Sequence, residues 1–442
     1  MEKTKSKDWY LSSFKAIQES LNGSASLTTN GKSATPFHDI RKQAIARFEK
    51  IDFPTTKNED WKYTNIAPIL NYNFTPVAGA EVSAADIEKF LIPNLKTSLI
   101  VLLNGNFSPK LSKIHLESNG VRIESFRNLL RIEPDFILEH FAKYAQLENG
   151  FVAFNTAFAD DGAVIYVPDN TIIDNCIHIL NVITAEAENI LSQPRNLIVA
   201  GRNSKIKIIE GYHSISENVS LTNVVNEIII GESAEVELYR IQNENLNSFH
   251  INRTQAEQKK GSVFTHYSVS LGGRIMRNDT NTVLDDENCT ANLYGLYLTE
   301  DSQHIDNHTL IDHAKPHCQS NELYKGVLND NSRGVFNGKV FVRKDAQKTN
   351  AYQSNKAILL SNEALVDTKP QLEIYADDVK CSHGAAIGQL DEDALFYLRT
   401  RGIGKEEART VLIRAFANDI FETIENEALH DYLNNLVFAK LK

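Results

Sequence analysis

A repeat in the middle of the chain constrains the fold more than any other feature. Residues 196–208 (NLIVAGRNSKIKI) align with residues 226–238 (NEIIIGESAEVEL) at a shift of thirty, and a further shift of thirty reaches a weaker third copy that begins at Gly261. In each copy a glycine marks a turn, after which apolar and polar residues alternate, so that Ile206 points inward and Lys205 outward. Repeats of this length stack as coils, and coils made of strands stack into a parallel β-helix.

The sequence around the repeat is typical of short strands. Residues 98–373 contain many short runs of Val, Ile, Leu, Tyr and Thr, separated by clusters of Asn, Asp, Gly and Ser. Such runs predict strands joined by turns. Two clear copies and a faint third favour the β-helix, and they leave a β-sandwich as the alternative.

Helical patterns precede this region. Residues 37–48 carry apolar side chains at helical spacing, and residues 86–91 predict another helix. Between them, residues 53–66 break the periodicity and hold two aromatic residues among charges. This pattern favours a packed corner over a docking loop.

The chain turns helical again near its C-terminal end. Asp391 is placed to cap a helix over residues 392–401, and Gly402 follows the end of that helix. A second helix is predicted from Lys405, with an apolar face formed by Ala408, Val411, Leu412, Ala415, Phe416 and Ile420. A last amphipathic segment covers residues 429–441. Because the last coil of a β-helix is open, part of this apolar surface is expected to cover it, and the remainder to bind a partner.

Length and charge narrow the classes of protein. The chain has 442 residues, which suits two or three domains, and we place them at 1–97 (helical), 98–388 (β-helix core) and 389–442 (helical). The net charge of −11 argues against general nucleic-acid binding, which needs a basic surface. No apolar run approaches the roughly 18 residues of a membrane helix, and the first residues lack the hydrophobic part of a secretory signal. We therefore expect a cytoplasmic protein with reduced thiols, since its four cysteines form no CxxC pair.

Two patterns resemble catalytic motifs without their structural context. Residues 26–33 end like a phosphate-binding loop but lack its first glycine, the strand before it and the helix after it, so we expect no ATP hydrolysis by this chain. Asp285 with Asp286, and Asp377 with Asp378, would suit a β-helix enzyme that cleaves glycans. Adjacent residues in a strand point to opposite faces, however, and solvated turn residues are the favoured interpretation.

One candidate metal site is rich in histidine. It consists of His304, His308, His313, His317 and Cys318. Imidazole and thiolate both bind zinc or iron, whereas polar residues in a stacked coil commonly form hydrogen-bonded ladders. The sequence favours the structural interpretation and leaves an iron-handling role open.

The strongest chemical signal lies near the end of the β region. In an extended strand, Cys381 and His383 share one face with Cα atoms roughly 6.6 Å apart, from two rises of about 3.3 Å, so thiolate and imidazole can converge on one metal ion. Lys380 beside the cysteine is expected to favour the thiolate somewhat. Two ligands cannot close a tetrahedral site, so either nearby residues or another subunit must complete it.

The same stretch carries a family resemblance. Residues 375–384 (YADDVKCSHG), preceded by VDTKPQLE at 366–373, closely resemble the SufB/SufD family of the Suf iron–sulfur cluster assembly machinery, and within it the SufD members. The SufB members lack the DDVKCSHG string. Further segments that resemble the family are 58–64 (NEDWKYT), 271–277 (LGGRIMR), 324–328 (YKGVL), 334–338 (GVFNG) and 395–403 (LFYLRTRGI).

The resemblance implies a right-handed parallel β-helix core between N-terminal and C-terminal helical domains, and a non-catalytic scaffold that binds no nucleotide itself. It implies pairing with a SufB-type scaffold through the C-terminal ends of the two β-helices, with a transient iron–sulfur cluster at their junction. His383 would then be a cluster or iron ligand and Cys381 an auxiliary one. The helical end would bind a SufC-type ATPase through Tyr397, Arg399, Arg401, Gly402 and Ile403.

Alternatives to the scaffold remain at this stage. One is a β-helix enzyme acting on glycans or acyl groups, and the other is a stand-alone metal-binding protein that uses the histidine-rich group. A homodimer of the isolated chain, paired through the β-helix end, is also left open.

Overall fold

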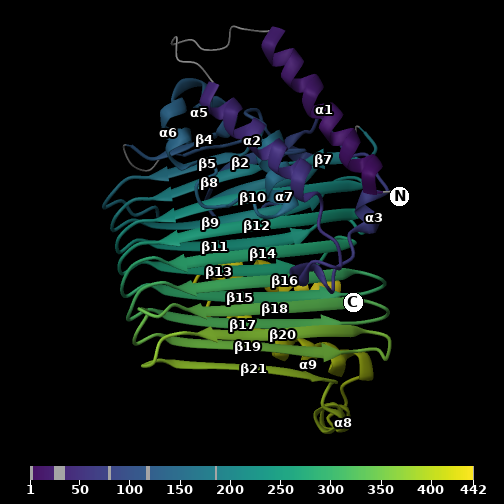
Figure 1. Ribbon diagram of the computed structural model, residues 1–442. Coiled ribbons are helices and arrows are strands. Elements are labelled where there is room, and N and C mark those ends of the chain that lie inside the picture. The colour runs from purple at the N-terminus through teal and green to yellow at the C-terminus, as the bar shows by residue number, and fades with distance from the viewer. Residues whose placement is uncertain (1–2, 24–34, 78–80, 116–119, 185–186, 442) are drawn as a thin grey trace.

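The protein is a tall stack of strand coils, seen from the side in Figure 1. The computed structural model describes residues 3–23, 35–77, 81–115, 120–184 and 187–441. Two sheets, called A and B here, run the length of the stack. The strands of sheet A, in spatial order, are β20 (Leu365–Ile374), β18 (Arg333–Val342), β16 (His304–His313), β14 (Ile275–Leu284), β12 (Ser248–Gln258), β10 (Ser220–Ile230), β8 (Arg195–Ala200), β5 (Ala163–Val167) and β4 (Arg122–Ser125), with β7 (Ile190–Ser192) and β1 (Thr75–Pro76) beside this path.

Sheet B has the complementary strands, because the chain alternates between the two sheets. Its strands, in spatial order, are β21 (Lys380–Gly388), β19 (Asn350–Leu359), β17 (Gln319–Leu328), β15 (Thr290–Thr299), β13 (Val263–Ser270), β11 (Glu235–Asn243), β9 (Lys205–Ser214), β6 (Cys176–Ile183), β2 (Thr97–Leu103) and β3 (Asn106–Phe107). The strands between the two ends of the stack pair in parallel. Among the described residues, the antiparallel pairs are β2 with β3, β4 with β5 and the single bridge between Leu99 and Lys113, all near the N-terminal end. The predicted parallel β-helix is thereby confirmed, and the β-sandwich alternative is wrong.

The shift of thirty between the sequence repeats equals the register between stacked coils. Asn226 lies opposite Asn196 in sheet A, and Glu235 lies opposite Lys205 in sheet B, which reproduces the shift of thirty. The expected third copy is out of phase, because Val236 pairs with Phe264, two positions short of that shift. The shortening lies between β11 and β12, because the start of β12 (Ser248) follows the start of β11 (Glu235) by 13 positions, whereas the start of β10 (Ser220) follows the start of β9 (Lys205) by 15.

Residues along each strand alternate, so that mostly apolar side chains face the interior and mostly polar ones face outward. Ile206 and Ile208 are fully buried in the interior, as predicted, and Lys205 forms an ion pair with Glu235 on the outside at 2.7 Å. The interior is not wholly apolar. Glu210 and Arg240, stacked in register on β9 and β11, are fully buried and joined by a 2.9 Å ion pair.

This buried ion pair yields a stability prediction. Replacing Arg240 by Met leaves the Glu210 carboxylate buried without its cation, and we expect a loss of about 3–5 kcal/mol in the free energy of unfolding. The matched control is Lys205→Met, which breaks a half-exposed pair and is expected to cost less than about 1 kcal/mol. Urea unfolding of both variants measures the difference, and equal losses would contradict the prediction.

Helices cover both flanks of the stack. The helices in the N-terminal part of the chain are α1 (Lys3–Gly23), α2 (Thr35–Ile51), the 3-10 turn η1 (Glu59–Trp61), α3 (Ala67–Leu70), α4 (Ala84–Glu88), α5 (Phe126–Ile132), α6 (Pro134–His140) and α7 (Gly150–Phe158). The helix predicted at 37–48 lies within α2, whereas the one predicted at 86–91 overlaps α4 only as far as Glu88. An aromatic cluster that includes Phe48 and Phe154 packs α2 and α7 against Phe249 and its neighbours on sheet A.

The aromatic segment at 53–66 is a packed corner, as predicted. Trp61 is only 4% exposed, and the Arg277 guanidinium of β14 lies 3.8 Å from the centre of its ring. Glu59 reaches further along the stack and forms a 2.6 Å ion pair with Lys369 of β20. This segment therefore ties the N-terminal part of the chain to the late coils of sheet A.

The C-terminal helices are α8 (Glu392–Thr400), α9 (Lys405–Phe421) and α10 (Glu427–Lys440). Asp391 caps α8 by accepting two backbone N–H groups, and Gly402 follows it at φ +87°, as predicted. Two expectations were wrong. First, α9 and α10 do not cover the open last coil, because they pack against the outer face of sheet B over β13, β15 and β17.

The second correction concerns the buried face of α9. Ala408 and Ile420 are buried as expected, but Val411 is 40% exposed and Ala415 also faces solvent. The side chains of α9 that fill the contact with sheet B are Ile413, Ala417, Ile420 and Phe421. The apolar residues of α9 are spread around the helix, so spacing alone does not determine which stripe is buried. No helix in the parts of the chain described above is long and apolar enough to cross a membrane.

Candidate functional site

The β-helix ends in an uncovered coil. Within the described residues, β20 pairs only with β18 and β21 only with β19, so each sheet finishes in an unpaired edge. Residues 382–388 of β21 are all exposed, whereas the strands in the middle of the stack are mostly buried. Figure 1 shows β21 at the far end of the stack, with α9 to one side and α8 projecting beyond it. Large exposed apolar side chains at this end are Tyr352, Leu365, Ile374, Tyr375 and Ile387.

Cys381 and His383 lie on this last strand and on the side that continues the interior. Cys381 is in register with buried Ala351, and His383 is in register with buried Gln353. Cys381 is half-buried against an apolar cluster, whereas His383 is exposed. The two predicted ligands therefore share one face, and that face opens outward because no further coil lies above it in the described chain.

The protonation of Cys381 differs from the expectation. Burial raises the pKa of its thiol above the usual value, and a backbone hydrogen bond to Ala351 offsets this only in part. Lys380, the neighbour expected to favour the thiolate, belongs to the opposite face of the strand and is exposed. Cys381 is thus a protonated thiol at neutral pH in the free chain, which suits an auxiliary role better than a leading one.

Nothing on the described part of this chain completes a metal site. No group of three or more His, Cys, Asp or Glu side chains in the described segments is arranged to hold a metal ion. His383 and Cys381 are therefore at most part of a ligand set. Whether a second subunit supplies the rest stays a prediction.

The histidine-rich group is divided between two sides of the chain. His304 and His308 face outward from β16, where His304 Nε2 lies 2.8 Å from Thr64 Oγ1 and His308 Nε2 lies 3.0 Å from Asp306. His313 and Cys318 are buried in the interior, and His317 is an exposed turn residue at φ +63°. The five residues do not converge, and most are already hydrogen-bonded, which favours the structural interpretation.

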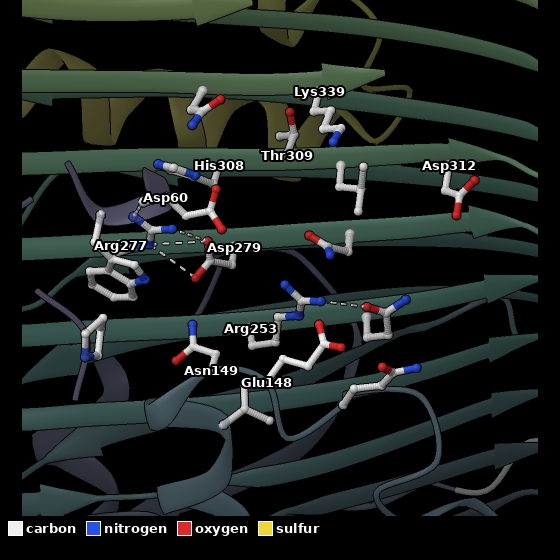
Figure 2. A pocket seen from close by; sticks show the side chains of 18 of the residues that line it. Asp60, Glu148, Asn149, Arg253, Arg277, Asp279, His308, Thr309, Asp312 and Lys339 are labelled. Carbon is white, nitrogen blue, oxygen red and sulfur yellow. Dashed lines mark hydrogen bonds and ion pairs between the residues drawn. The ribbon is translucent and has the colours of Figure 1, made fainter. Parts of the chain in front are cut away.

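A large polar cleft that the sequence did not predict lies on the outer face of sheet A (Figure 2). Its volume is about 900 Å³, and its walls are the outward side chains of β12 to β18 together with two N-terminal loops. Of the residues labelled in Figure 2, Asp60, Glu148 and Asn149 come from the two loops and the others from successive coils of sheet A, so no local motif brings them together. The one signal for this cleft in the sequence is the run of polar residues at the outward-facing positions of successive strands.

The charges of the cleft largely neutralise one another. Arg277 pairs with Asp279 and Asp306 at 2.8 Å each, and the carboxylates of Asp312 and Asp285 pair with Arg343 and Lys259. Glu257 is different, because burial raises its pKa to about 7. Asp285, Asp286, Asp377 and Asp378 themselves lie in turns, as expected.

The residues predicted to face an ATPase occupy α8 and the turn after it. Tyr397 is 56% exposed, and the Arg401 guanidinium donates to its hydroxyl at 3.1 Å. Arg399 and Gly402 are exposed and Ile403 is half-buried. Phe396, which no sequence motif singled out, is 68% exposed, more than any other large apolar side chain in the described segments. The phosphate-loop-like residues 26–33 lie outside the described residues.

Comparison with known proteins places this arrangement in a family. The model of the SUF system FeS cluster assembly SufBD core domain matches residues 182–416, and the model of the SufBD protein N-terminal region matches residues 10–179. The first match alone covers more than half of the chain. The chain belongs to the SufB/SufD family.

Relatives of this SufB/SufD chain match along nearly their whole length. An iron–sulfur cluster assembly SufBD family protein of Synechocystis is 33% identical over 408 residues, which cover 90% of each chain. The iron–sulfur cluster assembly protein SufD of Escherichia coli is 30% identical over 88% of this chain and 89% of its own. SufD of Bacillus subtilis is 27% identical over 91% of this chain and 94% of its own.

The interior carboxyl of Glu322 predicts a pH dependence of stability. Burial raises the pKa of Glu322 from 4.5 to about 7. Below the unfolded pKa the carboxyl is protonated in both states. As pH rises toward 7, the unfolded chain loses this proton while the folded chain still holds it, so the free energy of unfolding falls by about 3 kcal/mol. Glu322→Gln is expected to match wild type at pH 4.5 and to exceed it by roughly this amount at pH 8. Urea unfolding at both pH values measures this, and parallel pH profiles would refute it.

Proposed function

We propose that this chain is a non-catalytic, SufD-type scaffold subunit that docks the bare end of its β-helix onto a SufB-type partner. The observation that carries the proposal is the uncovered last coil, in which His383 and Cys381 lie beside two unpaired strand edges. Iron and the nascent cluster would be cargo at this junction, held only transiently. Family membership supports a role in iron–sulfur cluster assembly, and the geometry of the end supports the site.

An unpaired strand edge favours a partner with the same geometry. Exposed N–H and C=O groups of an edge strand pair with another strand, and natural proteins cover such edges unless they use them. Here two parallel edges, β20 and β21, end side by side with exposed apolar residues among them. The end of a second β-helix supplies two matching edges at once, which is why we propose a related scaffold rather than a peptide.

His383 would contribute an imidazole to the cluster site, and Cys381 would assist. A neutral imidazole binds iron without first losing a proton, whereas the thiol of Cys381 must be deprotonated by the approaching metal. The partner would supply the remaining ligands. The chain itself would bind no nucleotide, and α8 with Tyr397, Arg399, Arg401, Gly402 and Ile403 would carry a SufC-type ATPase. We retain the proposed domains 1–97, 98–388 and 389–442, and a cytoplasmic location.

Co-expression with a SufB-type scaffold and a SufC-type ATPase tests the proposal. We expect this chain to co-purify with both in a stable complex that accumulates iron and acid-labile sulfide on reconstitution, while the isolated chain accumulates little. Turnover of a glycan or acyl substrate by the isolated chain would contradict the scaffold role. So would failure to form the complex when all three chains are soluble.

A further inference from the structure

A column of polar side chains runs inside the β-helix directly beneath His383. Glu322 of β17 is in register with Gln353 of β19, and Gln353 is in register with His383 of β21. Residues in register on adjacent parallel strands stack on the same face, about 4.8 Å apart. Glu322 and Gln353 are each only 3% exposed, so the column passes from the closed interior to the open end at His383.

The carboxamide of Gln353 is held in one orientation. Its Nε2 donates to Glu322 Oε2 at 2.6 Å, which directs the nitrogen down the column. Gly338 of β18 faces it, and a Cβ at this glycine would lie 2.4 Å from Nε2, so the space for the amide exists only because position 338 has no side chain. The orientation is therefore fixed by both a hydrogen bond and the packing around it.

The other end of this amide lacks a partner. Gln353 Oε1 is buried, and in the described part of the chain no donor reaches it. A buried carbonyl oxygen without a hydrogen bond is costly, about 1–3 kcal/mol, and such groups are rare in native proteins. The side chain stacked next in the column, on the open side, is the imidazole of His383. An imidazole N–H is a suitable donor for this oxygen.

We propose that Gln353 is a positioning residue that accepts a hydrogen bond from one ring N–H of His383. The proposal rests on the proposed function in taking His383 as an iron or cluster ligand. The bond fixes the tautomer, so the second ring nitrogen keeps its lone pair and points out of the open end. Glu322 acts one step further back by holding the Gln353 amide the right way round. Outer partners of this kind typically change metal affinity by about 10–100-fold.

The chain offers a matched control for Gln353. Asn355 lies on the same strand and the same interior face and is also a fully buried amide, but the residue stacked on it is Ala385 instead of a histidine. Gln353→Met removes the acceptor while nearly preserving side-chain volume. Asn355→Leu removes a comparable amide without touching the column.

The first test is made on the free chain by ¹⁵N NMR of its histidine rings at pH 8, with the His383 signal assigned by its loss in His383→Ala. We expect a single neutral tautomer in wild type and in Asn355→Leu, and a mixture of tautomers in Gln353→Met. A tautomer mixture already present in folded wild type would overturn the proposal. The overturning outcome is read on the wild-type chain and needs no bound metal.

The second test measures Fe²⁺ affinity of the complex with the SufB-type partner by chelator competition. We expect Gln353→Met to weaken binding by about 10–100-fold and Asn355→Leu to leave it within about twofold. If His383→Ala weakens binding but the two amide variants behave alike, the positioning role is wrong and the proposed function stands. If His383→Ala itself leaves affinity unchanged, the proposed ligand is wrong, whatever the tautomer result.

Discussion

Replacing His383 by alanine is expected to abolish cluster accumulation without dissolving the complex that this chain forms. His383 is exposed on the last strand and packs against no core cluster, so its removal leaves the fold intact. As a direct ligand it should matter more than an outer partner, so we expect iron affinity to fall by more than about 100-fold. Iron and acid-labile sulfide per complex, after reconstitution and gel filtration, measure the effect.

Two companion variants make this result specific. Cys381→Ser should reduce cluster content less than His383→Ala, because the thiol is half-buried and protonated in the free chain. His317→Ala is the control, since this histidine is also exposed but lies on a turn two coils below the turn that precedes β21. Normal cluster content in His383→Ala, or equal losses in all three variants, would rule out His383 as the ligand.

Placing a charge on the bare end is expected to prevent docking of the SufB-type partner. Ile387 on β21 is 48% exposed, and Ile387→Lys would bury an unpaired ammonium group in the proposed interface. Such a change costs about 2–5 kcal/mol, which is roughly a 30-fold to several-thousand-fold weaker dissociation constant. Binding of the purified partner, followed by analytical ultracentrifugation or surface-based kinetics, measures it.

The same substitution at the opposite end of the stack serves as control. Ile172 is 63% exposed between β5 and β6, so Ile172→Lys makes an equivalent surface change without approaching β21.

A backbone variant gives independent support. Lys380 N–H donates to the carbonyl oxygen of Thr349, the residue before β19. In the alternating pattern of a parallel strand Ala385 N–H therefore points to the free edge, and Ala385→Pro removes it while sparing the pairing with β19. Undiminished binding by Ile387→Lys and Ala385→Pro would contradict docking through this end.

The β-helix itself was predictable because its determinant is local and repeated. The alternation around Ile206 and the turn glycines recur at the spacing of one coil, so the sequence records the register directly. The pairing of Cys381 with His383 on one face was predictable for the same reason, since a strand has a period of two. Asp391 and Gly402 marked the limits of α8 through capping chemistry that depends on a few adjacent residues.

Features that depend on contacts between distant segments were not predictable. The polar cleft draws Arg253, Asp279 and His308 from three successive coils, each an ordinary outward position in its own strand. Which residues of α9 are buried depends on how the helix lies on the outer face of sheet B, and Val411 was therefore assigned wrongly to the buried face. The raised pKa of Cys381 likewise follows from tertiary burial, which outweighs the neighbouring Lys380.

The most direct test of the central claim is amide hydrogen exchange along the last coil, with and without the SufB-type partner. The free edges of β20 (Leu365–Ile374) and β21 (Lys380–Gly388) should exchange quickly in the isolated chain. We predict that the partner slows exchange in both strands by at least about tenfold and leaves the middle of the stack, such as β13, unchanged. Formation of a stable complex in which β20 and β21 exchange as fast as in the free chain would contradict docking through the open end of the β-helix.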